Sequence, residues 1–166
     1  TFRNFSDNDA IVVEARNATP VVTGVVISGN SFFNNRRGVR IDGGTQINNT
    51  TVSASVLNNI LQKNGRGIFV RGNGTGSDGG NTVSATIDGN VVQGKNVPEE
   101  ETGSGINIQG ASDIGSFNTV TAIITNNEVT QIRNDGIVAN GCSANATGSN
   151  NTVNATITGN VVKYLR

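Results

Sequence analysis

The sequence predicts an all-β fold, a single-stranded right-handed parallel β-helix (β-solenoid) of about five coils. Three observations lead to this prediction. Two short motifs recur along the chain, and the Asn that ends the first motif returns at intervals of 29–37 residues. Both motifs alternate apolar and polar residues, which is the two-residue period of a half-buried strand. The composition, with 26 Asn and 22 Gly among 166 residues, supplies the turn residues that many tight corners need.

The first motif begins with Thr-Val, ends in Asn, and predicts the longest strand of each coil. It occupies residues 51–59, 82–90, 119–127 and 152–160, with a degenerate copy at 22–30. In the copy at 51–59, Val52, Ala54 and Val56 point to one side of the strand, and the intervening residues point to the other. Stacking the copies predicts three inward columns: Val52, Val83, Val120 and Val153; Ala54, Ala85, Ala122 and Ala155; and Val56, Ile87, Ile124 and Ile157.

The Asn that ends each copy of the first motif predicts a ladder at one corner of the coils. A corner Asn can bond its side-chain amide to the coils above and below and satisfy groups that the turn leaves unpaired. Turn propensity alone also favours Asn at a corner, but it does not require five of them in register. The predicted ladder consists of Asn30, Asn59, Asn90, Asn127 and Asn160.

The second motif lies between copies of the first and predicts another strand. It occupies residues 38–43, 67–72, 105–110 and 136–141, with a looser member at 10–15. A short apolar run after the corner Asn, as at Ile60-Leu61, Val91-Val92 and Val161-Val162, starts a third strand. One repeat of three short strands cannot bury its own apolar face, so it must stack on its neighbours. We therefore expect residues 1–166 to form one repeat domain, as part of a longer chain or of an assembly.

The stretch from Ile27 to Ile41 reads Ile-x-Gly-Asn-x-Phe-x-Asn-x-x-x-Gly-Val-x-Ile. This pattern resembles the parallel β-helix coil of the pectate-lyase-like superfamily, and the resemblance covers nearly the whole chain. It implies the architecture, which enzymes, adhesins and phage tailspikes share, and not one particular activity. The carbohydrate-active members of that superfamily act through carboxylates, sometimes with calcium and an Arg, on one outward face of the coils.

The composition excludes several classes of function. Twelve basic residues balance twelve acidic ones, so we expect no binding to nucleic acid. No apolar run approaches the length of a membrane span, so we expect no membrane insertion. The chain has no His and a single Cys, Cys142, which predicts neither a disulfide within the chain, nor a metal site, nor a cofactor.

The best candidate for a catalytic site lies on the outward side of the second motif. Glu14, Asp42 and Arg71 occupy equivalent positions there, and Arg40 is close by. Glu14 and Asp42 are expected about one strand spacing apart, roughly the 5 Å that separates the carboxyl groups of a retaining glycosidase. A surface charge ladder, in which arginine offsets two acids, accounts for the same residues without any activity. The sequence favours the ladder.

The outward side of the first motif is regular and rich in Thr and Ser. Its columns are Thr51, Thr82, Thr119 and Thr152; Ser53, Ser84, Thr121 and Asn154; and Ser55, Thr86, Ile123 and Thr156. Such an array resembles the ice-binding faces of some β-solenoids. Small β-branched polar residues also suit any exposed strand, which explains the columns without ice.

These observations favour a non-enzymatic role as a structural or adhesive protein, secreted or at the cell surface. Neither terminal coil reads as a polar cap. The open ends are therefore expected to continue in a longer chain or to stack on identical subunits, which would propagate as a filament. The first alternative is a β-helix that binds or cleaves polysaccharide, and the second is an ice-binding solenoid.

Overall fold

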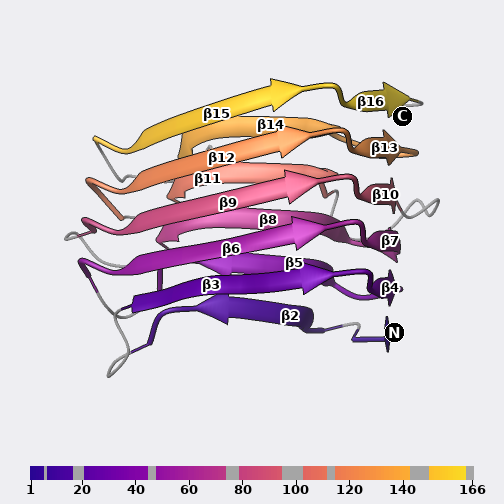
Figure 1. Cartoon of the computed structure of the whole chain (residues 1–166), viewed down its shortest axis with the longest axis horizontal. Coiled ribbons are helices and arrows are strands. Elements are labelled where there is room, and N and C mark those ends of the chain that lie inside the picture. The colour runs from indigo at the N-terminus through magenta and orange to yellow at the C-terminus, as the bar shows by residue number, and fades with distance from the viewer. Residues whose placement is uncertain are drawn as a thin grey trace.

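The computed structural model describes residues 1–5, 7–16, 21–44, 48–73, 79–94, 103–111, 115–142 and 150–163. In these ranges the chain forms sixteen strands, β1 to β16, and no helix. The strands form three parallel sheets, which are the sides of coils stacked along a common axis (Figure 1). Each coil adds one strand to each sheet, because a coil can bury its apolar face only against the coils above and below it.

The two motifs and the short runs build one sheet each. Sheet 1 is made by the first motif and consists of β3 (Val21–Ser28), β6 (Thr51–Leu57), β9 (Thr82–Asp88), β12 (Thr119–Thr125) and β15 (Thr152–Thr158). Sheet 2 is made by the second motif and consists of β2 (Asp9–Glu14), β5 (Arg37–Asp42), β8 (Arg66–Asn73), β11 (Ile106–Ala111) and β14 (Ile137–Cys142). Sheet 3 consists of β1 (Phe2–Arg3), β4 (Ser31–Phe33), β7 (Ile60–Asn64), β10 (Val91–Gly94), β13 (Glu128–Thr130) and β16 (Val161–Lys163).

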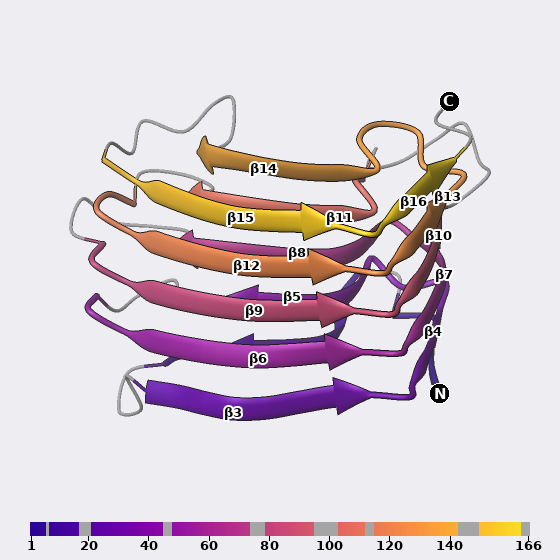
Figure 2. The same cartoon turned by 45° about the horizontal axis from the view of Figure 1, so that its top comes forward.

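The predicted fold class is confirmed. Figure 2 shows sheet 1 in front of sheet 2, with sheet 3 closing one side. Five stacked strands in each of sheets 1 and 2 correspond to about four turns of the chain from the first strand to the last, close to the five coils predicted. The chain is therefore a parallel β-solenoid.

The core lies between the three sheets and is built from the predicted columns. Val52, Val83 and Val120 are Cα partners in neighbouring strands and are fully buried. The Ala and Val/Ile columns are paired in the same register. Side chains of the last coil are less covered, and Ile157 is 45% exposed although Ile124 in the same column is 0% exposed. Burial in this fold thus depends on having a coil on both sides.

The predicted Asn ladder is also present. The backbone N–H and the Nδ2 of Asn59 both donate to Oδ1 of Asn90, at 2.9 and 3.0 Å. Asn90 donates in the same way to Asn127, both bonds being 2.9 Å. The Nδ2 of every ladder Asn after Asn30 also reaches a main-chain carbonyl of the preceding coil, as Asn90 does to Val56 O at 2.8 Å. The ladder therefore satisfies backbone groups that the corner removes from the sheets.

The residue just before each ladder Asn adopts a left-handed conformation. Gly29, Gly89 and Gly159 have φ of 66°, and Asn58 and Asn126 have φ of 54° and 55° at the same position. Gly and Asn are the residues that tolerate this region best, which explains why they alternate there. The glycines that end the second motif have a different reason, because a Cβ at Gly72 would overlap the carbonyl oxygen of Gly110 in the next coil.

Candidate functional site

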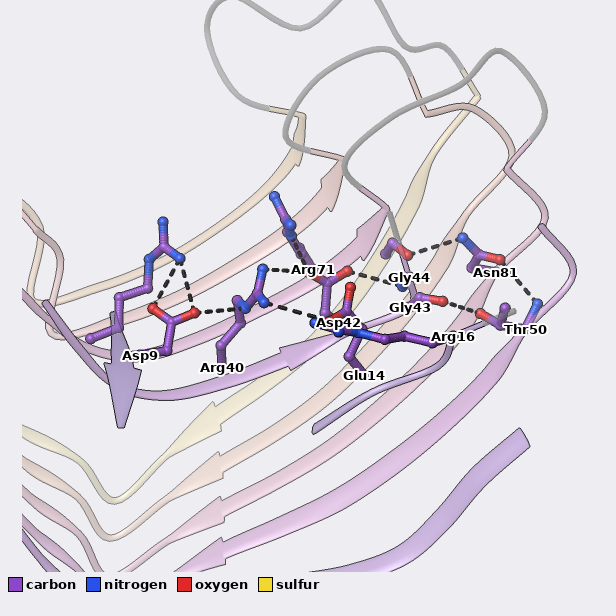
Figure 3. Close-up of polar contacts among 12 residues, drawn as sticks. Asp9, Glu14, Arg16, Arg40, Asp42, Gly43, Gly44, Thr50, Arg71 and Asn81 are labelled. Carbon is purple, nitrogen blue, oxygen red and sulfur yellow. Dashed lines mark hydrogen bonds and ion pairs between the residues drawn. The ribbon is translucent and has the colours of Figure 1, made fainter. Parts of the chain in front are cut away.

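The predicted site residues lie together on the outer side of sheet 2. Glu14 and Asp42 are Cα partners in β2 and β5, and Asp42 is the partner of Arg71 in β8. The register thus brings the two acids and Arg71 into one column on three successive coils. In Figure 3 the side chains of Arg71 and of Arg40, the residue two positions before Asp42 on the same strand, both point toward Asp42.

Arg40 is the centre of an ion network that reaches three carboxylates. Its Nε lies 2.8 Å from Asp9 Oδ2, its Nη1 3.2 Å from Asp42 Oδ2, and its Nη2 3.6 Å from Glu14 Oε2. The contact between Nε and Asp9 is a close ion pair without the direction of a hydrogen bond. Because one guanidinium serves three acids, the cluster ties β2 to β5 through charge as well as through the sheet.

Asp42 is fully buried and has no unused oxygen. Its Oδ2 accepts from Arg71 Nε at 2.5 Å as well as from Arg40. Its Oδ1 accepts from the backbone N–H of Gly44 at 3.0 Å. The corner that follows is held by Thr50, whose hydroxyl donates to Gly43 O and whose N–H donates to Asn81 Oδ1 (Figure 3). Asp42 therefore fixes the turn that leaves β5.

The side chain of Glu14, like that of Asp42, is buried. Its side chain is 4% exposed, and its Oε2 lies 2.8 Å from Nη2 of Arg16 and 2.9 Å from Nε of the same residue. Arg16 is the outermost member of the cluster, with a side chain 76% exposed. Both acids of the candidate pair are thus shielded from solvent and held by guanidinium groups.

Basic side chains outnumber acids around this network. The guanidinium carbons of Arg37, Arg66 and Arg71 lie 5.4, 5.1 and 5.8 Å from the ring centroid of buried Phe69, within the range of cation–π contacts. Burial lowers the pKa of Arg37, Asp9 opposes this effect, and the neighbouring guanidinium groups, with Arg36 the largest, lower it further. The first three strands of sheet 2 thus carry a compact, positively charged outer face.

The surroundings of Glu14 and Asp42 limit the chemistry that these two acids can perform. A glycosidase needs one carboxyl group to donate a proton and another to attack or to activate water, and both must reach the substrate. Here Glu14 and Asp42 are neighbours, as predicted, but their oxygens face arginine rather than an open cleft. Buried acids that are each paired with arginine suit a structural network better than proton transfer.

The outer face of sheet 1 has the predicted columns. Thr51, Thr82, Thr119 and Thr152 are Cα partners in successive strands, and the other two columns keep the same register. Asp88 is the one acid in these strands, and it accepts from Thr125 Oγ1 at 2.6 Å and from Asn126 Nδ2 at 2.9 Å. These two hydrogen bonds lower the pKa of Asp88. The face is therefore nearly uncharged.

Three features of the structure go beyond the sequence prediction. Asp9 and Arg37 belong to the ion network. A second Asn ladder runs through Asn81, Asn118 and Asn151, and a third joins Asn35 to Asn64. The second ladder has a clear signal in the sequence, because each of its members directly precedes a Thr-Val pair.

In the part of the chain that the structure describes, no three His, Cys, Asp or Glu side chains are grouped to hold a metal ion. The same part contains no helix that could span a membrane. Comparison of the chain with family models, with curated proteins and with solved structures finds no match. The parallel β-solenoid is shown by the structure, and the resemblance to the pectate-lyase-like superfamily rests on the sequence pattern alone.

Proposed function

We propose that this chain is a non-enzymatic structural or adhesive β-solenoid, secreted or displayed at the cell surface. The observation that carries the proposal is the state of the candidate acids. Asp42 is 0% exposed and Glu14 has a 4% exposed side chain, and arginine is paired with one oxygen of each, Asp42 Oδ2 and Glu14 Oε2. Many polar side chains instead form ladders and ion pairs that connect one coil to the next. Such a molecule is a stiff stack of coils with a nearly uncharged outer face along sheet 1.

The Thr and Ser columns support an adhesive role in one specific way. They present a regular, flat and nearly uncharged face, whose hydroxyl groups can bind a polar surface without a deep pocket. Ile123 and Asp88 interrupt the hydroxyl pattern, so the face is less uniform than an array matched to ice. We therefore place general adhesion before ice binding.

Polysaccharide turnover is the decisive test of the non-enzymatic proposal. The chain is incubated with acidic and neutral polysaccharides, and the release of reducing ends and of unsaturated products is measured. The matched variants are Glu14→Gln and Asp42→Asn, which change the candidate acids, and Ser84→Ala, which changes the outer face of sheet 1. We expect no turnover by any of them. Turnover that the two acid variants lose and Ser84→Ala keeps would replace the structural proposal with an enzymatic one.

A further inference from the structure

Asn107 differs from the other buried asparagines of the part of the chain that the structure describes. It is 7% exposed, and its Oδ1 is enclosed without a hydrogen-bond partner. The other buried asparagines in that part belong to the ladders, where each side chain has at least one hydrogen bond. An enclosed polar atom without a partner is unfavourable for the folded chain, so its presence at this place calls for an explanation.

The position of Asn107 in sheet 2 sets it beside the arginine cluster. Asn107 is the Cα partner of Phe69 in β8, and it alternates with the core residues Ile106 and Ile108, so it lies on the outer side of the sheet. Three guanidinium carbons lie 5.4, 5.1 and 5.8 Å from the ring centroid of Phe69, those of Arg37, Arg66 and Arg71. The acceptor without a partner thus lies one strand from a group of strong donors.

The acids on the described strands of sheet 2 do not use all of these donors. Each of the three carboxylates is paired with two arginines, and none of these ion pairs includes Arg66. Nε of Arg37 is enclosed and has no acceptor either. Burial lowers the pKa of Arg37 and the guanidinium groups of three neighbours lower it further, so an additional negative charge is favourable here.

A second acceptor without a partner lies one coil further on. Oδ1 of Asn140 is enclosed and makes no hydrogen bond. Asn140 is the Cα partner of Gln109, and Gln109 is the partner of Arg71. β11 and β14 contain no charged residue. The outer face of sheet 2 therefore changes from guanidinium donors on β8 to amide side chains on β11 and β14.

We propose that the outer face of sheet 2, where β8 meets β11, binds a phosphate or sulfate ester on a ligand that also carries hydroxyl groups. Arg66, which is half-buried and reaches solvent, holds the oxyanion together with Nε of Arg37, and Asn107 Oδ1 accepts a hydrogen bond from a hydroxyl group. A tetrahedral oxyanion offers acceptors in several directions and so fits guanidinium groups from two successive strands, whereas a carboxylate has two oxygens in one plane. The inference rests on the adhesive role proposed above and gives it a class of partner.

Binding to immobilised polymers tests the class of ligand. The probes are dextran sulfate and poly(glycerol phosphate), with a polyuronate and neutral dextran as references. We expect both ester polymers to bind, and inorganic sulfate to displace them at an ionic strength at which chloride does not. The polymer that binds more tightly identifies the ester. Equal binding of the polyuronate would mean that charge alone attracts the polymer, and this result overturns the proposal, as does the absence of binding to both ester polymers.

Arg66→Met tests the donor. It removes the arginine without an acidic partner and keeps an apolar side chain over Phe69, and it is expected to weaken binding by about tenfold or more. Lys63→Met is the matched control, because Lys63 Nζ lies 5.2 Å from the ring centroid of Phe33 and has the same kind of contact on sheet 3. Equal weakening in both variants would show a general attraction between charges and overturn the site.

Asn107→Leu gives a readout that a structural role would not give. Leucine has a similar size and no unpartnered oxygen, so the variant is expected to unfold at a higher urea concentration than the wild type and to bind about threefold more weakly or less. Asn118→Leu is the matched control for stability and is expected to unfold at a lower urea concentration, because the side chain of Asn118 is bonded to two other ladder residues. An Asn107→Leu variant that loses stability and keeps its binding would refute the hydroxyl contact.

This inference and the proposed function can fail separately. A chain that binds neither ester polymer and shows no polysaccharide turnover refutes the inference and leaves the non-enzymatic role intact. Turnover refutes the non-enzymatic role whether or not the ester polymers bind.

Discussion

Replacing Asn90 with alanine tests the claim that the corner ladder holds the coils together. Asn90 has five side-chain hydrogen bonds. Its Oδ1 accepts from the backbone N–H and from Nδ2 of Asn59, and its Nδ2 donates to Val56 O, to Asp88 O and to Asn127 Oδ1. The alanine variant removes all five. The backbone N–H of Asn59 is then left without a partner at a position where Asn59 is 1% exposed.

The expected cost follows from these contacts. A buried donor that loses its acceptor costs about 1–3 kcal/mol, and each further hydrogen bond contributes about 1 kcal/mol net. The acceptors Val56 O and Asp88 O have other ways to be satisfied, so we expect a total loss of about 3–5 kcal/mol. This is a large fraction of the stability of an ordinary domain, about 5–15 kcal/mol.

Asn30→Ala is the matched control, because Asn30 has the same chemistry at the edge of the ladder. Its side chain donates to Ser28 O and to Asn59 Oδ1, and its backbone N–H keeps the bond to Asn59 Oδ1 in the variant. No buried group loses its partner, so a loss of about 1 kcal/mol is expected. Asn90→Gly distinguishes the contribution of the ladder hydrogen bonds from that of turn propensity. Glycine suits a corner as well as asparagine does, but it has no side-chain amide.

The assay combines urea unfolding with hydrogen exchange. Unfolding compares the free energies of the three variants, and exchange reports the protection of the Asn59 amide locally, which is useful because coils of a solenoid can open separately. Equal losses in Asn30→Ala and Asn90→Ala would refute the reasoning, as would Asn90→Gly with wild-type stability. Either result would mean that Asn occupies these corners for its turn propensity alone.

Three further predictions concern packing, charge and pH. Ala85→Leu is expected to overpack the core and to lower the free energy of unfolding by about 1–3 kcal/mol, whereas Ser84→Ala is expected to change it by at most about 0.5 kcal/mol. Equal stability of the two variants in thermal unfolding would contradict the assignment of the inner and outer faces. Arg40→Met is expected to lower the free energy of unfolding in urea by about 1–3 kcal/mol. The loss stays moderate because each of the three carboxylates that Arg40 contacts keeps another arginine partner. An unchanged free energy of unfolding would show that the ion network contributes nothing to stability. The lowered pKa of Asp88 stabilises the fold above the ordinary carboxyl value of about 3.9, and this contribution is lost as the pH falls through the folded pKa. The stability difference between wild type and Asp88→Ala should therefore shrink in acid, and a difference that grows in acid would contradict the sign.

The strands could be predicted from the sequence because their pattern depends on side-chain parity. Val52, Ala54 and Val56 recur with the same spacing in four copies, and a shift of one residue would turn all of them outward. The corner Asn could be predicted for a related reason, because it follows the strand of the first motif at the same number of residues in every copy. The ladder through Asn81 and Asn118 carried a comparable signal, an Asn before each Thr-Val pair, and it was missed because those residues fall outside the motif as defined.

The site was predicted less well than the fold. The shared column of Glu14, Asp42 and Arg71 follows from strand register, and the structure has it. The burial of Asp42 does not follow, because the outer side of a sheet is ordinarily wet and the sequence does not reveal what encloses it. Asp9 lies at the other end of β2, so its contact with Arg40 depends on the reach of the arginine side chain and not on its place in the column.

The constant register of the sheets has a consequence for how this chain can change in length. Successive ladder Asn residues are 29, 31, 37 and 33 positions apart, yet β6, β9, β12 and β15 pair without a shift. Insertions of up to eight residues are therefore accommodated between strands and leave the stack undisturbed. Since each coil continues the same corner ladder, a whole coil could be duplicated, deleted or exchanged in the gene, and foreign peptides could be grafted where the spacing already varies.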